Sequence, residues 1–195
     1  MNYLNGHSRR NFTLLLCSLV SILAILACQI EVGGPEPPGA VIPTTQGGQD
    51  LLSSAWDQAV EAALTTGRVM VIFDEIQLTT FLSSELAEQE EPPLLSPQVY
   101  LQEDSIQIYG ILDQGPFLAN ALLVVQPEIE PDGQLSFELT QADVGPLPLP
   151  SALKNTISAI LTEAFTGTIG SLATGVRITS IAISDGEMAI VGELR

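Results

Sequence analysis

Few side chains in this sequence could carry nucleophilic or metal chemistry, and they lie near its start. The one histidine is His7, and the two cysteines are Cys17 and Cys28. A Ser–His or Cys–His nucleophile pair needs an imidazole beside the nucleophile, and zinc sites commonly use imidazole or thiolate ligands. The sequence also lacks a Gly-rich phosphate loop followed by Lys and a dinucleotide-binding fingerprint. We therefore expect a non-enzymatic protein with no catalytic residues, no cofactor and no metal.

Carboxylates are the remaining candidates, because 23 Asp and Glu residues stand against six Lys and Arg, for a formal net charge of −17. A carboxylate pair could perform acid–base or glycosidic chemistry, but spacing distinguishes no pair among so many acids. The spaced aspartates of a calcium loop are absent, and Asp132-Gly133 and Asp185-Gly186 are typical of hairpin turns. The charge excludes nucleic acid as a partner, since phosphate binding needs clustered basic residues. It also disfavours electrostatic binding to anionic lipid.

The N-terminus has the features of an export signal. Arg9 and Arg10 precede sixteen uncharged residues, FTLLLCSLVSILAILA, at positions 12–27. A short basic region followed by such an apolar run predicts a secretory signal peptide over residues 1–27. Residues 8–12 also resemble the start of a twin-arginine motif, whereas the strong hydrophobicity of the run favours the general secretory route. Both routes stay open.

The apolar run ends at Ile25-Leu26-Ala27-Cys28, which resembles the lipobox of bacterial lipoproteins. That resemblance implies a diacylglycerol on the Cys28 thiol and cleavage before it, although Leu26 is larger than usual. It predicts a cell-membrane protein whose domain is held on the extracytoplasmic face by its lipid. One alternative is an uncleaved anchor, for which the run is short of the roughly 20 residues that a spanning helix needs. The other is ordinary cleavage that leaves Cys28 free.

Loss of residues 1–27 would leave a chain without histidine and with Cys28 as its one cysteine, so the folded domain could form no disulfide. Residues 28–49 are rich in Gly and Pro and lack apolar periodicity, which predicts a lipidated N-terminus followed by a disordered linker. Residues 50–195 are then expected to form a single domain.

Three helices are predicted in that domain. The first has Asp50 as its N-cap and ends at Gly67, before a strand over residues 68–73. Asp74 and Gln77 have the spacing of a capping box for a second helix that runs to about Gln89. The third begins near Ser151 and carries apolar residues at helical spacing to Phe165, before Gly167, Gly170 and Gly175 interrupt it.

The strands predicted between and after these helices form hairpins. Alternating apolar residues occupy 99–101 with 106–108, 135–139 and 181–183 with 188–190, while residues 117–125 are apolar on both faces. The fold class expected is α+β, with a strongly twisted antiparallel sheet of about five or six strands and two or three helices on one side. The first and last hairpins match at an offset of 82 residues, which reflects either an internal repeat or the similarity of all hairpins.

The order of these features resembles the YpmS-like and LmeA-like envelope proteins. The resemblance covers about residues 68–194 and includes the I-x-I-x-G strand at 106–110, G-x-L-P-L-P at 145–150 and the terminal hairpin at 185–192. It implies a TULIP-like or half-TULIP fold, in which a curved sheet wraps a long helix and holds lipid. The implied ligand is a phospholipid or another apolar molecule, and no protein partner is implied.

A groove between sheet and helix would be lined by alternating strand residues and one helix stripe. The candidate lining residues are Leu122, Val124, Leu135, Phe137, Leu139, Ile157, Ile160, Leu161 and Phe165. Each of these side chains could equally be ordinary core. Two functions therefore stand side by side: a membrane-anchored lipid-binding module, and a structural or interaction lipoprotein with a solid core and an acidic surface. An enzyme based on paired carboxylates is the weaker third.

Overall fold

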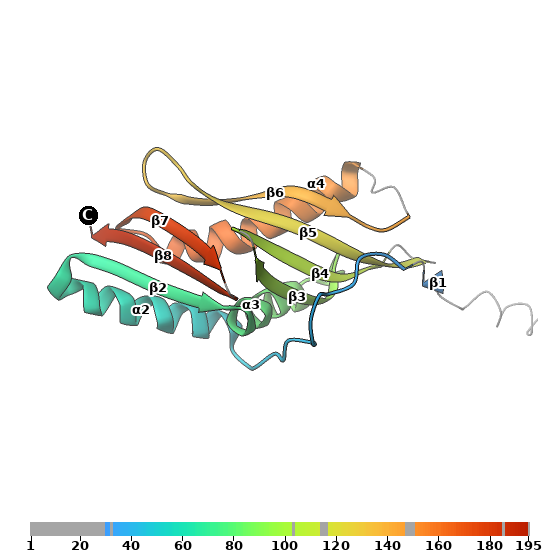
Figure 1. The fold of residues 1–195 in the computed structure, drawn as a ribbon, viewed down its shortest axis with the longest axis horizontal. Helices are drawn as coiled ribbons and strands as arrows, with labels where there is room; N and C mark the ends of the chain where they lie inside the picture. The colour runs from blue at the N-terminus through green and yellow to red at the C-terminus, as the bar shows by residue number, and fades with distance from the viewer. Residues whose placement is uncertain are drawn as a thin grey trace, which may run out of the picture.

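The computed structural model describes residues 30–31, 33–102, 104–113, 117–146, 151–184 and 186–194, so Cys28 and the predicted signal lie outside the described residues. Figure 1 shows the arrangement of the elements. The helices are α2 (Gly48–Thr66), α3 (Glu75–Ala87), α4 (Ser151–Thr162), the π-helix η1 (Glu163–Ile169) and α5 (Gly170–Leu172). The strands are β1 (Ile30–Glu31), β2 (Arg68–Asp74), β3 (Leu95–Gln102), β4 (Ser105–Asp113), β5 (Phe117–Ile129), β6 (Leu135–Asp143), β7 (Val176–Ser184) and β8 (Glu187–Leu194).

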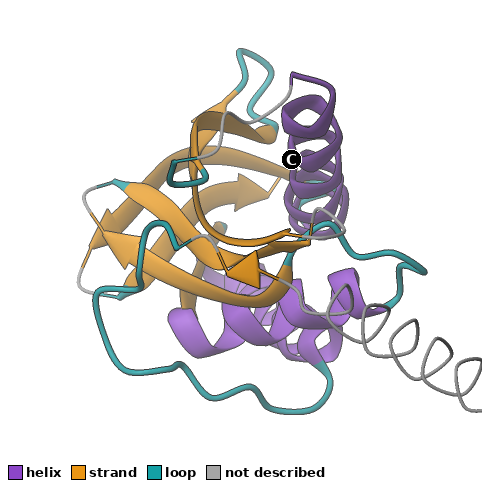
Figure 2. Ribbon diagram, turned by 90° about the vertical axis from the view of Figure 1, so that its right-hand side faces the viewer, coloured by secondary structure: helices purple, strands orange, loops and turns teal. Residues whose placement is uncertain are grey.

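The predicted α+β class is confirmed, with the antiparallel strands divided between two sheets. The first sheet has the order β3-β4-β5-β6, and β1 pairs in parallel with the start of β5. The second has the order β2-β8-β7, which joins the first long strand of the domain to the last. Helix α3 packs against β3, α2 against β2, and α4 against β6. Figure 2 shows the strands curving round one side, with α2 and α3 below and α4 to the upper right.

The outer edge of β3 is covered by side chains of α3 rather than by another strand. The Val99 N–H donates to Thr79 Oγ1 (2.9 Å), and the Leu101 N–H donates to Glu75 Oε1 (2.9 Å). The N–H of Gly186, in the β7–β8 turn, donates to the Leu101 carbonyl (3.4 Å). Since a free edge would otherwise leave these amides unpaired, α3 both satisfies the edge and stops the ladder at β3. This explains why the strands form two sheets.

The opposite edge, at β6, is covered in the same manner by α4 and η1. The Phe137 N–H donates to Thr166 Oγ1 (3.2 Å), and Thr162 Oγ1 donates to the Phe137 carbonyl (3.3 Å). Phe137 lies opposite Pro127 of β5. Because Phe137 directs its backbone polar groups toward the helix, Pro127 occupies a position where no ladder N–H is needed. A proline therefore fits within this long strand.

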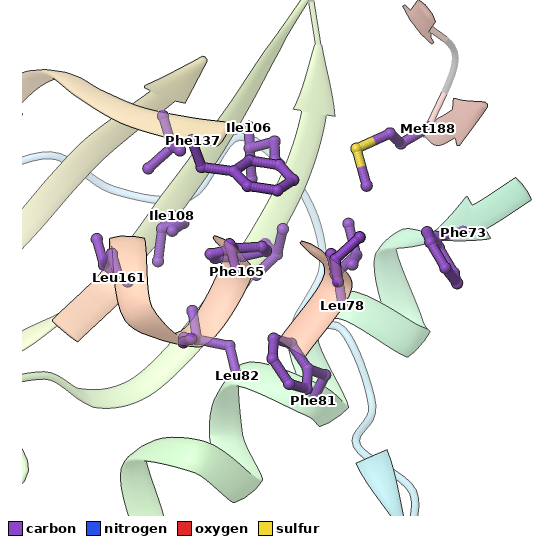
Figure 3. Packing of buried hydrophobic residues seen from close by; sticks show 14 of the residues in the cluster. Phe73, Leu78, Phe81, Leu82, Ile106, Ile108, Phe137, Leu161, Phe165 and Met188 are labelled. Carbon is purple, nitrogen blue, oxygen red and sulfur yellow. The ribbon is translucent and has the colours of Figure 1, made fainter. Parts of the chain in front are cut away.

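One apolar core joins both sheets and the helices, with Phe165 of η1 fully buried within it. The Phe165 ring centroid lies 5.8 Å from that of Phe81 on α3 and 5.3 Å from that of Phe137 on β6. Figure 3 shows Phe165 among these rings, with Leu161 and Ile108 nearby. Such aromatic pairs contribute about 0.5–1.5 kcal/mol each beyond the area they bury. Phe165 thus ties the third helix to the second helix and to the first sheet.

The first and last hairpins are built alike, which favours the internal repeat over chance similarity. In β3–β4, Val99 pairs with Ile108 and the register shifts between Leu95 and Gln98. In β7–β8 the residues 82 positions later, Ile181 and Ile190, also pair with each other, and the register shifts between Ile178 and Ser180. A Cβ at Gly110 would lie 2.7 Å from Leu94 Cγ and 3.0 Å from the Leu95 carbonyl oxygen. Gly192 lies 82 residues after Gly110, and a Cβ there would lie similarly close to Val176 and to the Arg177 carbonyl oxygen.

Two helix boundaries differ from those expected. Helix α2 begins at Gly48 with Gly47 as N-cap (φ 78°), and Asp50 lies in its first turn. A Cβ at Gly48 would lie 2.6 Å from the Phe81 Cα, so close contact with α3 requires glycine there.

The capping box of Asp74 and Gln77 is confirmed by both of its hydrogen bonds (2.7 and 2.9 Å).

The third helix is longer than expected, because α4 continues through Gly167 and Gly170 as η1 and α5. Helix-interior glycine costs only about 1 kcal/mol relative to alanine, and burial of Phe165 and Ile169 offsets that cost. The chain turns after this helix near Gly175 (φ 86°). Among the described residues, no helix is long and apolar enough to cross a membrane.

We predict that Thr79→Val destabilises the protein by about 1–3 kcal/mol, because the similar shape removes the acceptor of a buried backbone N–H. Thr65→Val is the control, since Thr65 is exposed near the end of α2 and bonds only within its own helix. It should change stability by no more than about 0.5 kcal/mol. Urea unfolding measures both. Equal effects would show that the Thr79 hydroxyl does not support the sheet edge.

Candidate functional site

Seven of the nine predicted groove residues lie together, but as packed core. They belong to, or pack against, the main apolar cluster between β6 and the α4–η1 helix: Leu135, Phe137, Leu139, Ile157, Ile160, Leu161 and Phe165. Phe165 is fully buried, and Ile157 and Leu161 are nearly so. A cavity of about 220 Å³ near Gly133 and Gly170 touches only Leu135 of the seven. Around Ile157, Leu161 and Phe165 the space between the layers is therefore filled by protein side chains.

The other two predicted lining residues, Leu122 and Val124, point to the opposite face of β5, which corrects the prediction. Ala121 and Leu123 are the buried neighbours whose side chains face the main core. Leu122 instead packs in a second cluster on the outer face of the sheet. Strand side chains alternate between faces, and both faces of residues 117–125 are apolar, so the sequence pattern does not show which face is inner.

Residues 33–47, which we name the strap, lie across that outer face, and the prediction of a disordered linker here is wrong. The Ile42 N–H donates to Gln98 Oε1 (2.6 Å), and Gln98 Nε2 donates to the Ile42 carbonyl (3.4 Å). The Tyr100 hydroxyl donates to the Ala40 carbonyl (3.1 Å). The Thr45 N–H donates to Thr80 Oγ1 on α3 (3.1 Å). Side chains from β3 and α3 thus satisfy backbone groups that a Pro- and Gly-rich segment cannot pair within itself.

A small apolar cluster holds the middle of the strap on the sheet. Ile42 packs with Tyr100, Tyr109 and the half-buried Leu122. The two tyrosine rings meet edge to face, with centroids 5.6 Å apart. Tyr100 and Tyr109 occupy the outward positions of the predicted hairpin, where aromatic residues on a solvent-facing side would be unusual. That alternation was the available sequence signal for a segment covering this face.

The strap borders two cavities that meet at the exposed side chain of Val41, and together we name them the strap groove. The larger has a volume of about 590 Å³ and lies between the strap, the end of α3 and the start of β3. Its lining residues are Val41, Ile42, Pro43, Thr44, Ser83, Leu86, Ala87, Pro92, Leu94, Leu95, Ser96, Pro97 and Gln98. The smaller has about 230 Å³ and extends toward Pro35, Pro37 and Asn120.

The lining of the strap groove suits an apolar ligand. None of the described residues that line either cavity is charged, although 23 acids are present in the chain. Ser96 lines both cavities and has a positive φ of 49°, a conformation that L-residues adopt at a cost and that recurs at binding sites. A volume near 600 Å³ lies in the range of small-molecule sites. Within the described residues, no group of three His, Cys, Asp or Glu side chains could hold a metal.

Tyr100 makes the attachment of the strap sensitive to alkaline pH. Burial, then the charge of Glu75, then Tyr109 raise the pKa of Tyr100 above its ordinary value near 10. Because the folded-state pKa is the higher one, the contribution of neutral Tyr100 is complete below about pH 10 and is lost as pH rises through the folded pKa. A phenolate also has no proton to donate to Ala40.

We therefore predict that absorbance at alkaline pH shows a tyrosine titrating above pH 10, and that Tyr100→Phe removes it. In Tyr100→Phe the Ile42 amide should exchange hydrogen faster already at neutral pH, because the bond to Ala40 is missing. Titration of Tyr100 at its ordinary pKa, with unchanged exchange at Ile42, would contradict the role given to this hydroxyl.

Comparisons with known proteins add no relative. A scan against protein-family models, a search of curated proteins and a search of solved structures each found no match to this chain.

Proposed function

We propose that this protein is a non-enzymatic lipoprotein, exported and attached to the cell membrane by a lipid on Cys28, whose strap groove binds an acyl chain or another elongated apolar ligand. The observation that carries the proposal is an uncharged groove of about 590 Å³ on an otherwise strongly acidic protein. An apolar chain gains roughly 0.8 kcal/mol per buried methylene. Even a partly buried chain would therefore bind usefully.

The sequence supports the attachment. Residues 12–27 form an uncharged run after Arg9 and Arg10, and Ala27-Cys28 ends it in the pattern of a lipobox. The resemblance to YpmS-like and LmeA-like envelope proteins supports a lipid or apolar ligand. The structure alters where that ligand would bind, because the space between sheet and helix is packed core and the apolar groove lies beneath the strap.

We predict that Cys28→Ser abolishes incorporation of labelled palmitate and blocks the cleavage before residue 28. Serine has no thiol to accept the diacylglycerol, although the apolar run is unchanged. Cys17→Ser is the matched control, since Cys17 lies inside the predicted signal and should not affect labelling. Unchanged labelling in Cys28→Ser would refute the lipobox interpretation.

We predict that Val41→Glu weakens binding of a fluorescent fatty acid at least tenfold, because it places a carboxylate where both cavities meet. Val41 is 81% exposed, so the variant should fold. Leu64→Glu is the control: Leu64 is 73% exposed on α2, outside both linings. Binding would be measured on residues 28–195 carrying Cys28→Ser, which retain every described residue. Equal affinities for both variants would exclude the strap groove as the site.

The packed interlayer core favours a second candidate, a structural or interaction lipoprotein without a small ligand. Phe81, Phe137 and Phe165 fill the centre where a TULIP-like carrier would hold lipid. In this second candidate, the acidic surface would keep the protein soluble and repel non-specific partners. Native mass spectrometry separates the two candidates. If the protein retains lipid and Val41→Glu loses it, the strap groove is supported as the binding site. If the protein has the mass of its chain alone, binds no fatty acid and crosslinks to a defined neighbour in cells, the interaction protein is supported.

A further inference from the structure

The entry of the chain into the fold is fixed at one end of the domain. Ile30 and Glu31 pair in parallel with Phe117 and Leu118 at the start of β5. Just after this pair, the Asn120 N–H donates to the Gly33 carbonyl (3.0 Å). The first described residues of the chain are therefore attached to the same strand by backbone contacts.

Glycine packing restricts this entry further. A Cβ at Gly34 (φ 134°) would lie 2.3 Å from the Asn120 carbonyl oxygen. A Cβ at Gly145 (φ 63°), in the turn after β6, would lie 2.7 Å from the Gly34 Cα. The start of the strap thus passes between β5 and that turn with room for backbone alone. Side chains at either glycine would force it away from the sheet.

We infer that the end of the domain where β1 lies faces the lipid bilayer at contact distance, while the α2–β2 turn points away from it. This inference rests on the proposed lipid at Cys28. Gln29 alone separates Cys28 from Ile30, so two Cα–Cα steps span at most about 7 Å. A flexible linker over residues 29–49 would instead have separated domain and membrane by roughly 25 Å.

The shape of the molecule agrees with this orientation. Figure 1 shows β1 at one end of the longest axis, with the α2–β2 turn and the C-terminus at the other. The flank formed by α2 and the end of α3 carries exposed acids, among them Asp50, Asp57, Glu61 and Glu88. The β1 end also carries exposed acids, Glu36, Asp113 and Asp143, so the orientation rests on the length of the tether and not on charge.

This orientation also places the ligand site beside the bilayer. The smaller cavity of the strap groove is lined by Pro35, next to Gly34, and by Asn120, which bonds Gly33. An acyl chain leaving the bilayer would therefore meet that cavity first and the larger cavity behind Val41 second. The β1 end itself would contact the headgroup layer of the membrane to which the protein is attached.

The test uses the full lipidated chain in vesicles that contain headgroup-quencher lipids. The thiol of Cys28 is consumed by the lipid, so Glu36→Cys or Thr65→Cys each supplies one labelling site. Glu36 is exposed beside the entry, and Thr65 is exposed near the α2–β2 turn. We expect several-fold stronger quenching of a fluorophore at residue 36 than at residue 65. Equal quenching, or stronger quenching at residue 65, overturns the inference.

A linker variant separates tether length from general membrane affinity. A 20-residue Gly-Ser insertion between Gln29 and Ile30 adds a coil of roughly 25 Å and should remove most quenching at residue 36. The same insertion between Glu90 and Glu91, in the loop after α3, lengthens the chain equally and should leave the quenching unchanged. Unchanged quenching after the first insertion contradicts the short tether.

Mass analysis distinguishes the two levels of failure. A chain that carries no diacylglycerol at Cys28, yet remains with the membrane, refutes the proposed attachment. A chain shown to be lipidated at Cys28 with equal quenching at both labels refutes the orientation alone.

Discussion

The fold depends on helix side chains that satisfy the two open edges of its first sheet. Thr79 and Glu75 of α3 accept hydrogen bonds from the backbone of β3, while Thr162 and Thr166 bond both backbone groups of Phe137 in β6. A sheet edge must be paired, covered or charged to avoid further strand addition. Because both edges are covered by helices, the sheet stops at four long strands, and β2, β7 and β8 form a second sheet. The same contacts bring Phe165 into the centre of the core.

The covering of both sheet edges by helices also determines where the structure leaves space for a ligand. Helices that pack on the edges and face of the sheet leave Phe165 fully buried, and seven of the nine residues predicted to line an interlayer groove belong to or pack against the core. The opposite face of the sheet carries Tyr100 and Tyr109 and is covered only by the strap. An extended, Pro-rich segment cannot fill a surface as densely as a helix. The larger uncharged cavity therefore lies beside the strap, and a cavity of about 220 Å³ remains between β6 and the end of the third helix.

Local features of the fold could be predicted from the sequence because neighbouring residues determine them. The capping box of Asp74 and Gln77, the strand that precedes it and the pairing of both hairpins each depend on residues a few positions apart. The 82-residue offset between hairpins also extends to their bulges and close-packed glycines. Seven of the nine predicted groove residues belong to or pack against the main core. The other two, Leu122 and Val124, lie on the opposite face of their strand.

By itself the sequence determined the periodic elements, the acidic character and the lack of histidine after His7, since composition and spacing contain all of these. The tertiary structure alone decided which apolar face of β5 became core and where residues 33–47 lie. Both outcomes depend on contacts between distant segments, such as the pairing of Gln98 with Ile42, 56 residues apart. A pattern of Gly and Pro disfavours a helix or strand in a segment. Whether that segment packs depends on the surface that other elements present to it.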